Sequence, residues 1–346
     1  MKAKYKRHIL NFKRPSGTSR GVLHTKETWF LIIEDQSKIG VGECGILRGL
    51  SIDDRPDFEE KLKWLCKNIN KDYSFLRDQL EEFPAILFGL EMAIQSLSVK
   101  NPFELFPSDF TLGSGKIPIN GLIWMGEKSF MKKQIEEKIE QGFSCIKLKI
   151  GAIDFQQELD LLSYIRKEFS SETIELRVDA NGAFHPDEAL LKLEKLSKLD
   201  LHSIEQPIKQ GQFEAMKTLC KKTPLPIALD EELIGVFSVT KKEELLQTIQ
   251  PQYIILKPSL LGGFQASQDW ISAAEQNEID WWITSALESN LGLNAIAQWT
   301  YTHKTKLPQG LGTGSLYTNN IDSPLTVKKE FLTYNPKKSW DTIILK

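Results

Sequence analysis

The sequence predicts an α/β protein built as a (β/α)7β TIM-type barrel with an α+β capping domain. Three observations predict this fold. From about residue 117, short apolar segments alternate with segments of helical period. Eight apolar segments occur in that part, and seven of them precede a plausible helix. Polar residues also end successive apolar segments at a nearly constant spacing. With 346 residues, the chain has room for a barrel and a smaller domain.

The first hundred or so residues combine strands and helices. The β-rich segment 27–34 and the segment 39–43 flank a short polar turn, which predicts a hairpin. Helices are predicted at 58–68 and 84–99, and the second opens with a proline, a residue suited to a first helical turn. We therefore expect an N-terminal α+β capping domain over residues 1–112.

The regular part of the chain covers residues 113–314. Strands that alternate with helices pair in parallel, so this part is expected to form the barrel. No eighth helix is predicted after Gly314, because Pro324 and Pro336 interrupt the tail. We expect residues 315–346 to return to the cap. The eight predicted strands, in chain order, are IPINGLIW, FSCIKLKI, TIELRVD, HSIE, PIALD, YIILK, IDWWITS and LPQGLGTG.

Composition excludes several classes of function. The formal net charge is −2, so the surface as a whole is not expected to attract nucleic acid or an anionic membrane. The basic start lacks the apolar region of a signal peptide, and no apolar run approaches the length of a membrane helix. The four cysteines are scattered and form no C-x-x-C pair, and no H-E-x-x-H occurs. We expect a cytoplasmic protein with reduced thiols and no histidine-built metal site.

Charged residues stand at the ends of predicted strands two to six. In a TIM-type barrel these ends form the active-site face. The residues follow one another at intervals of 25 to 30 positions, the length of one strand–helix unit, so they are expected at equivalent heights around the ring. They are Lys147 with Lys149, Asp179, Glu205, Asp230 and Lys257.

Each of these residues alone has a simpler interpretation, as the wet face of a strand, a turn or a loop entry. Together they have a different meaning. Strands covered by helices should be apolar on both faces, so two inward lysines need a functional reason. Three carboxylates meeting in a barrel mouth would repel one another unless a cation lay among them. Oxygen ligands select a hard ion, so the sequence predicts Mg²⁺, with Mn²⁺ as an alternative.

These parts fit one kind of chemistry. Removing a proton next to a carboxylate creates an enediolate with two negative charges, and a divalent metal neutralises that charge as it develops. The base must be deprotonated near neutral pH, which a lysine beside a metal and a second lysine can achieve. The expected partner is a small-molecule carboxylate substrate.

At this point the sequence resembles the enolase superfamily, in its muconate-lactonizing-enzyme-like branch. The resemblance covers nearly the whole chain, cap included. It implies a lysine base that works with Mg²⁺ on an enediolate. It implies Asp179, Glu205 and Asp230 as metal ligands, Lys149 as the base of a syn elimination, and Lys257 as a cation that stabilises the enediolate. The motifs that carry it are Lys147-Leu148-Lys149, Asp179-Ala180-Asn181-Gly182, Glu205-Gln206-Pro207, Asp230-Glu231-Glu232 and Lys257-Pro258.

Shorter stretches narrow the implied reaction to the dehydration of a succinyl-substituted cyclohexadiene carboxylate. They are Gly42-Glu43-Cys44-Gly45, Ser285-Ala286-Leu287-Glu288-Ser289 and Gly310-Leu311-Gly312-Thr313-Gly314. The same resemblance implies substrate contacts from Lys147, Asn181, Ser285 and Gly312. The loop around Thr18-Ser19-Arg20 is a candidate for contacting the succinyl tail.

Three alternatives stay open at this level. An N-succinylamino acid racemase and a dipeptide epimerase would use the same site, and a non-catalytic barrel that binds a ligand is the alternative from another class. Epimerases of this branch typically carry Asp-x-Asp at the eighth strand, where this sequence has Gly310-Leu311-Gly312-Thr313. The oligomeric state is not fixed by the sequence.

Overall fold

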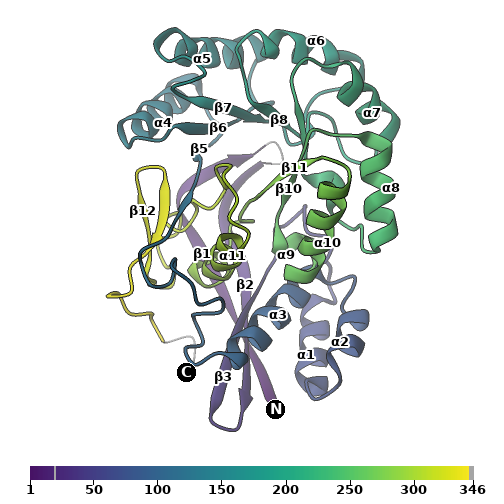
Figure 1. The fold of residues 1–346 in the computed structure, drawn as a ribbon, viewed down its shortest axis with the longest axis vertical. Helices are drawn as coiled ribbons and strands as arrows, with labels where there is room; N and C mark the ends of the chain where they lie inside the picture. Colours follow the sequence, from purple (N-terminus) through teal and green to yellow (C-terminus); the bar gives the residue numbers. More distant parts are fainter. Residues whose placement is uncertain (19–20, 343–346) are drawn as a thin grey trace.

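The computed structural model describes residues 1–18 and 21–342 (Figure 1). The N-terminal part holds a three-stranded antiparallel sheet, in the order β1-β2-β3, and three helices. Figure 1 shows α1 and α2 at the lower end of the molecule, strands β1 and β2 running from there up toward β5, and the later helices arched above. The elements are β1 (Lys2–Thr18), β2 (Gly21–Asp35), β3 (Lys38–Gly45), α1 (Phe58–Asn68), α2 (Tyr73–Gln79) and α3 (Pro84–Ser98).

The predicted hairpin is confirmed as β2 and β3, which pair up to Asp35 and Lys38 at the turn. Both predicted helices are confirmed as α1 and α3. Strand β1 was not predicted. Its first residues alternate lysines with less polar residues, and the lysines at positions 2, 4 and 6 are exposed on an edge strand.

Helix α3 packs directly on β3, and glycine makes this close approach possible. A Cβ added to Gly42 would lie 1.8 Å from the backbone oxygen of Gly89 in α3. The buried core of this part combines Trp29 and Leu31 of β2 with residues of α1 and α3, such as Leu62. The apolar faces of sheet and helices therefore cover one another.

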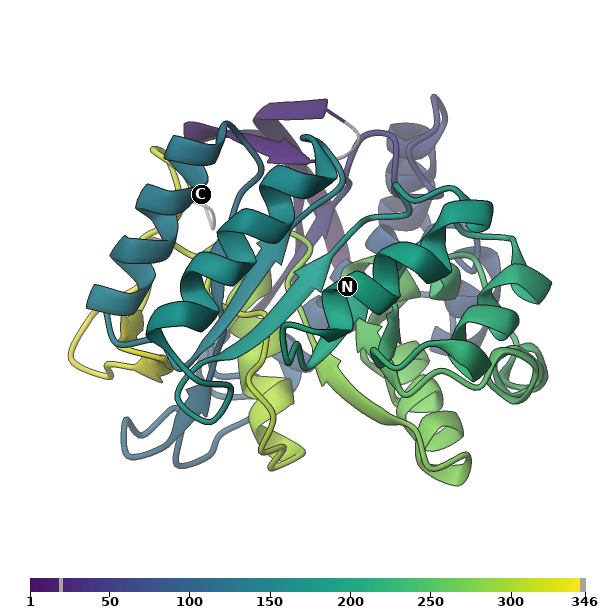
Figure 2. The ribbon, with the colours of Figure 1, turned by 90° about the horizontal axis from the view of Figure 1, so that it is seen from above.

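The larger part is a seven-stranded parallel sheet in which neighbours in sequence are neighbours in space. The α/β class is confirmed. Viewed from above, the sheet curls and its helices lie on the outer side (Figure 2). The strands are β5 (Gly121–Ile123), β6 (Cys145–Lys149), β7 (Glu175–Asp179), β8 (Ser203–Glu205), β9 (Ile227–Leu229), β10 (Tyr253–Leu256) and β11 (Asp280–Ile283). The helices are α4 (Lys128–Glu140), α5 (Phe155–Glu168), α6 (Pro186–Ser197), α7 (Phe213–Lys222), α8 (Val239–Ile249), α9 (Pro258–Leu261), α10 (Gly263–Gln276) and α11 (Asn290–Thr302).

The eighth predicted strand is reduced to two isolated parallel bridges. Gly310 pairs with Thr284 after β11, and Gln309 pairs with Ile119 before β5. These bridges connect the two edge strands of the sheet. The segment forms no longer ladder because Pro308 has no backbone N–H to donate and glycines weaken a strand.

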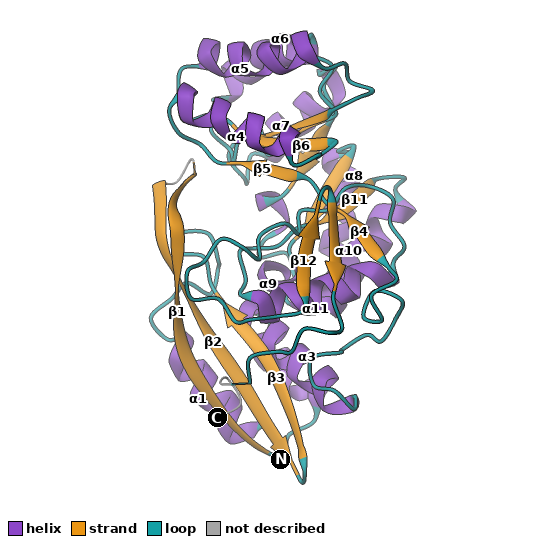
Figure 3. Cartoon of the chain, turned by 90° about the vertical axis from the view of Figure 1, so that its left-hand side faces the viewer, coloured by secondary structure: helices purple, strands orange, loops and turns teal. Residues whose placement is uncertain are grey.

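The first predicted barrel strand is split between two sheets. Its beginning, β4 (Lys116–Pro118), pairs antiparallel with β13, and only β5 joins the parallel sheet. The C-terminal hairpin β12 (Leu325–Lys328) and β13 (Phe331–Tyr334) completes this small sheet, which the sequence did not predict. It lies apart from the long strands β1–β3 (Figure 3).

The chain also returns to β1 just before this hairpin. Thr318 N donates to Asn11 O at 2.9 Å, and Lys13 N donates to Leu316 O at 2.8 Å. Within residues 1–18 and 21–342, no helix combines the length and the apolar character needed to cross a membrane.

Two buried carboxylates of the N-terminal part cap helices of the larger part. Glu91 of α3 accepts hydrogen bonds from the first backbone N–H groups of α10, including Gln265 N at 3.3 Å. Glu43 of β3 accepts from Ser289 N at 2.9 Å and Gly292 N at 2.8 Å at the start of α11. Each carboxylate satisfies N–H groups that a helix start leaves without partners.

Candidate active site

The strand register brings the predicted residues side by side. Asp179, the last residue of β7, is the Cα partner of Lys149 in β6 and of Glu205 in β8. Alternate residues of a strand share a face, so Lys147 stands on the same side as Lys149. The parallel ladder therefore places base and carboxylates at one edge.

Both lysines of β6 point at Asp179. Lys147 Nζ lies 3.0 Å and Lys149 Nζ 2.9 Å from Asp179 Oδ2. Lys147 also forms an ion pair with Glu205 Oε2. Lys149 Nζ donates a second hydrogen bond, 2.7 Å long, to Asn181 Oδ1. The predicted base is thus held by two oxygen acceptors.

Lys257 lies on the opposite side of the carboxylates. It follows β10 and pairs with Asp230 Oδ2, while Glu205 Oε1 is 3.7 Å from its Nζ. The two predicted catalytic lysines, Lys149 and Lys257, therefore approach the carboxylate group from different strands. The structure brings all six predicted strand-end residues together.

The charges of these groups shift their titration. Burial tends to raise the pKa of Asp179, but Lys147, Lys149 and Lys257 outweigh this and hold the pKa well below its usual range. Burial tends to lower the pKa of Lys257, but Asp230 leads the carboxylates that outweigh it, so the pKa is raised. Asp179 and Lys257 are both charged at neutral pH.

Asp230 behaves differently from Asp179. Burial raises its pKa well above the usual range, and nearby Glu231 and Glu205 raise it further, against the opposing charge of Lys257. This part of the site holds more negative charge than its lysine compensates. An added cation would remove that imbalance.

The donor set fits a divalent, oxygen-preferring cation. Four buried carboxylates and three lysines meet here, so the group holds one more acidic side chain than basic side chains. Among the described residues, Glu205 Oε1 accepts no hydrogen bond although it is buried. In the same ranges, no three His, Cys, Asp or Glu side chains form a group that could hold a metal as they stand, and lysine Nζ atoms pair with Asp179, Glu205 and Asp230. The carboxylates are Asp179, Glu205, Asp230 and Glu231.

Asn181 links the base to this group. It adopts a left-handed backbone conformation with φ of 45°, which asparagine tolerates better than most residues. Its N–H donates to Asp179 Oδ1 at 3.0 Å, and its Nδ2 donates to Glu231 Oε1 at 3.1 Å. Asn181 was predicted to contact substrate; the structure shows it holding Lys149, and a substrate contact stays a prediction.

Gln206 and Glu232 are supporting residues that belong to motifs found in the sequence but were given no role there. Gln206 Oε1 accepts from the backbone N–H of Asp230 at 3.2 Å, and its Nε2 donates to Glu232 Oε2 at 2.9 Å. Gln206 thereby ties the end of β8 to the start of the segment after β9. Gln206 has a left-handed φ of 40°. The sequence could not predict this conformation, because glutamine does not favour the left-handed region.

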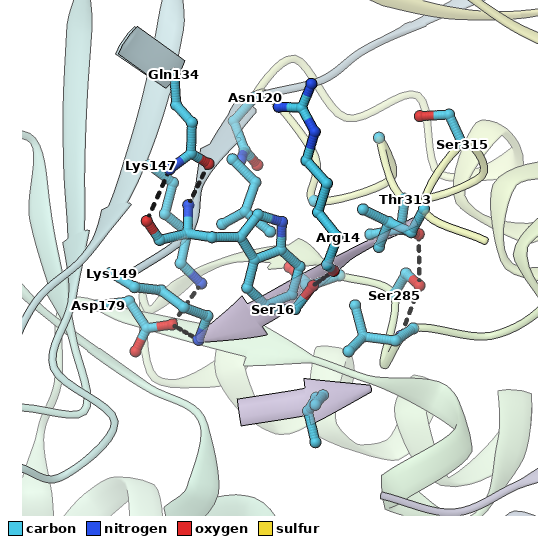
Figure 4. A pocket seen from close by; sticks show the side chains of 18 of the residues that line it. Arg14, Ser16, Asn120, Gln134, Lys147, Lys149, Asp179, Ser285, Thr313 and Ser315 are labelled. Carbon is cyan, nitrogen blue, oxygen red and sulfur yellow. Dashed lines mark hydrogen bonds and ion pairs between the residues drawn. The ribbon is translucent and has the colours of Figure 1, made fainter. Parts of the chain in front are cut away.

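A cavity of about 800 Å³ opens beside these residues (Figure 4). Its wall combines residues of the parallel-sheet part with residues of the N-terminal part, including Arg14 and Ser16 of β1. Eight lysines and arginines line it but only two carboxylates, Asp179 and Glu137, among the residues that the structure describes. The cavity is therefore suited to a substrate with more than one negative charge.

The aromatic wall of the cavity was not predicted. The side-chain amide of Gln134 in α4 pairs with the backbone of Trp124, accepting from its N–H and donating to its carbonyl, both at 3.0 Å. Trp124 lines the cavity. Such an amide-to-backbone pair depends on tertiary contact between a helix and a loop and leaves no pattern in the sequence.

Ser285 and Gly312 both line the cavity, as a substrate contact requires. The Ser285 hydroxyl already donates to Glu288 Oε2 at 2.6 Å and accepts from Leu287 N at 3.0 Å and Thr313 Oγ1 at 2.9 Å. Direct contact of Ser285 or Gly312 with substrate stays a prediction. In the loop proposed for the succinyl tail, Ser19 and Arg20 lie outside the described residues.

Comparisons with known proteins identify the family and relatives of this chain. Residues 131–337 match the family of enolase C-terminal domain-like proteins. An o-succinylbenzoate synthase of Desulfotalea psychrophila is 48% identical, across 94% of this chain and 97% of that protein. The crystal structure of MenC from the same organism has a TM-score of 0.86 at 44% identity, covering 96% of this chain and 99% of that chain.

More distant similarity extends to epimerases. The L-Ala-D/L-Glu epimerase of Bacillus subtilis is 26% identical across 62% of this chain and 55% of that protein. Its substrate-liganded structure has a TM-score of 0.83 at 20% identity, covering 96% of each chain, which shows a shared fold.

Proposed function

Because the chain belongs to the enolase C-terminal domain-like family, we propose that it is an o-succinylbenzoate synthase of menaquinone biosynthesis. The reaction dehydrates 2-succinyl-6-hydroxy-2,4-cyclohexadiene-1-carboxylate to o-succinylbenzoate. The observation that carries the proposal is the placement of Lys149 and Lys257 on different sides of three buried carboxylates. The identity to a synthase along nearly the whole chain supports it.

Lys149 is the base in this proposal. Its Nζ removes the proton from the ring carbon that bears the carboxylate, and the electrons move into the carboxylate to form an enediolate. The hydroxyl on the adjacent ring carbon then leaves with a proton from Lys149, which releases water and makes the ring aromatic. One base serves both steps on one face of the ring, so the elimination is syn. Asn181 Oδ1, 2.7 Å from Lys149 Nζ, fixes the direction from which the proton is taken.

Lys257 and the carboxylates support the charge that develops. Lys257 stays protonated and stabilises the enediolate as a cation. Asp179, Glu205 and Asp230 would hold Mg²⁺ or Mn²⁺, which supplies positive charge against the substrate carboxylate. Lys147, ion-paired with Asp179, keeps positive charge next to the base and helps hold the substrate carboxylate.

The charge of the cavity favours this substrate over a dipeptide. The substrate carries two carboxylates, and the residues that line the cavity include the basic residues Lys13, Arg14 and Lys329. A dipeptide also carries an ammonium group that needs a carboxylate partner. The eighth-strand segment 310–313 offers none. An N-succinylamino acid racemase would use the same two lysines as bases, so racemisation is the expected side activity to test.

The same proposal covers the barrel architecture, the domain boundaries and the cellular location. The bridges through residues 309–310 support an eight-stranded (β/α)7β barrel. We divide the chain into a capping domain (1–112), the barrel (113–314) and a C-terminal segment (315–346). We propose a cytoplasmic enzyme that acts on a small carboxylate and on neither nucleic acid nor membrane.

A kinetic comparison tests the function. The purified protein with Mg²⁺ should consume the cyclohexadiene substrate, followed by loss of its absorbance, far faster than it epimerises any dipeptide. A dipeptide with the higher kcat/KM would show that the assignment is wrong. Loss of turnover in Lys149→Ala serves as the control that the measured reaction belongs to this site.

A further inference from the structure

The loop between β11 and α11 holds a strained residue in the cavity wall. Leu287 has a φ of 63°, a left-handed conformation that a leucine rarely adopts. Its neighbours Ser285 and Ala286 line the cavity with it. Strained residues persist only where surrounding contacts over-determine them, and they gather at functional sites.

Hydrogen bonds fix this conformation on both sides of Leu287. The Leu287 N–H donates to Ser285 Oγ at 3.0 Å, and Tyr317 Oη donates to the Leu287 carbonyl at 2.6 Å. The Ser285 hydroxyl in turn donates to Glu288 Oε2 at 2.6 Å, and Ala286 N donates to Glu288 Oε1 at 3.1 Å. The carboxylate of Glu288 therefore accepts hydrogen bonds from two residues of the same turn, Ser285 and Ala286.

Glu288 is completely buried, and it is connected to the cap by charge. Lys26 of β2 is 4% exposed, and its Nζ donates no hydrogen bond within the described residues. The carboxylates whose negative charge favours the ammonium form of Lys26 are Glu43 and Glu288. Gly45 leaves room for this ammonium group, because an added Cβ there would lie 2.5 Å from Lys26 Nζ.

We propose that Glu288 is a positioning residue which holds Leu287 in its left-handed conformation, so that the leucine side chain contacts the carbon skeleton of the substrate away from the reacting carbon. This inference rests on the proposed function. The geometry of the turn supports it, since within residues 1–18 and 21–342 no hydrogen bond of Ser285 or Glu288 is directed at the carboxylates that would hold the metal. The turn would act on substrate fit and leave the chemistry to the lysines.

Two substitutions at Leu287 separate contact from strain. Leu287→Ala keeps the strained backbone and removes most of the side chain, while Leu287→Gly removes both the side chain and the strain. Each should raise KM for the cyclohexadiene substrate about 10-fold, with kcat within about twofold of the unchanged protein. Leu287→Gly should also unfold about 2 °C or more above Leu287→Ala. Leu191→Ala, at a leucine that is 63% exposed on α6, is the control and should change neither constant.

Glu288→Gln tests the positioning role. Its amide nitrogen cannot accept a hydrogen bond, so one contact of the turn is lost. KM should rise in this variant, and combining it with Leu287→Gly should add little, because the glycine variant has no side chain left to position. If Glu288→Gln does not fold, Tyr317→Phe removes the other hydrogen bond to Leu287 and should raise KM in the same way, again without effect in the Leu287→Gly background. An unchanged KM in Leu287→Ala, or fully additive effects, would overturn the proposal.

Failure of the proposed function gives a different result. If the unchanged protein does not dehydrate the cyclohexadiene substrate, that activity is wrong for this chain. The thermal measurements still decide whether Glu288 holds Leu287. Glu288→Gln should then lower the melting temperature more in the original background than in Leu287→Gly, and equal losses would rule the positioning role out.

Discussion

Lys149 and Asp179 are paired across the parallel ladder of β6 and β7, and their side chains form an ion pair of 2.9 Å. The proposed base thus has a proposed metal ligand as its permanent neighbour. A divalent ion bound to Asp179 would offset part of the carboxylate's negative charge. The attraction between Asp179 and a protonated lysine would then be weaker. This relationship couples metal binding to the readiness of the base.

The first prediction concerns the metal. Chelation should abolish dehydration, and added Mg²⁺ or Mn²⁺ should restore it, because the buried carboxylates need a cation. Mg²⁺ should also raise the melting temperature of the unchanged protein but not that of Glu205→Gln. Full activity in excess chelator, or in Glu205→Gln, would show that the metal site is misassigned.

The second prediction concerns Lys257. Lys257→Ala should lower kcat at least about 10²-fold, the usual scale for removing one electrostatic stabiliser of a developing anion. The matched control is Lys242→Met, which removes another buried lysine, on α8 outside the cavity. Its kcat should stay near that of the unchanged protein. A similar kcat in both variants would show that Lys257 does not stabilise the developing anion.

The third prediction concerns Lys147. Burial tends to lower its pKa, but Asp179 and Glu205 outweigh burial and raise it, so Lys147 is a cation throughout an ordinary assay range. A cation next to a lysine base favours the deprotonated form of the base. Removing it in Lys147→Met should shift the rise of kcat/KM to higher pH, measured at saturating Mg²⁺. The midpoint belongs to the coupled site. A midpoint that stays or falls would leave Lys147 with substrate binding alone.

The fourth prediction concerns stability and Asp53. This buried carboxylate accepts from Ala85 N at 2.8 Å at the start of α3, and burial raises its pKa from 3.8 to about 7. The folded protein therefore keeps a proton that the unfolded chain has released, and the stability from this group is lost as pH rises from about 4 through 7. The change is at most about 4 kcal/mol, from about 1.4 kcal/mol per pKa unit.

Urea unfolding at pH 5 and pH 8 measures this effect. The free energy of unfolding should fall between these values in the unchanged protein and change less in Asp53→Asn. Glu82→Gln removes a carboxylate that is 70% exposed and serves as the control. Equal pH dependence in the unchanged protein and Asp53→Asn would mean that Asp53 is not the group responsible.

The strand-end residues could be predicted because the fold repeats. One strand–helix unit has a nearly fixed length, so charged residues such as Asp179 and Glu205 at that spacing had to meet. The lysines of β6 followed from the two-residue period of a strand. The sequence pattern was sufficient where the position of a side chain depended only on one strand face or on the length of one strand–helix unit.

The remaining features depend on contacts between distant segments. Strand β1 resembles a basic, solvated segment because its lysines face water on one side of an edge strand. Helix α2 is only seven residues long, too short to show a helical period. The left-handed conformation of Leu287 comes from Glu288 and Tyr317, and no residue type at that position announces it.

Through the carboxylates of Glu43 and Glu91, the N-terminal part of the chain completes helices of the larger part. Both carboxylates belong to the first third of the chain, yet they complete the starts of α10 and α11. A chimera that joins the parallel-sheet part of this chain to the N-terminal part of a distant relative would leave these backbone N–H groups without acceptors, unless that part supplies carboxylates at the same two places.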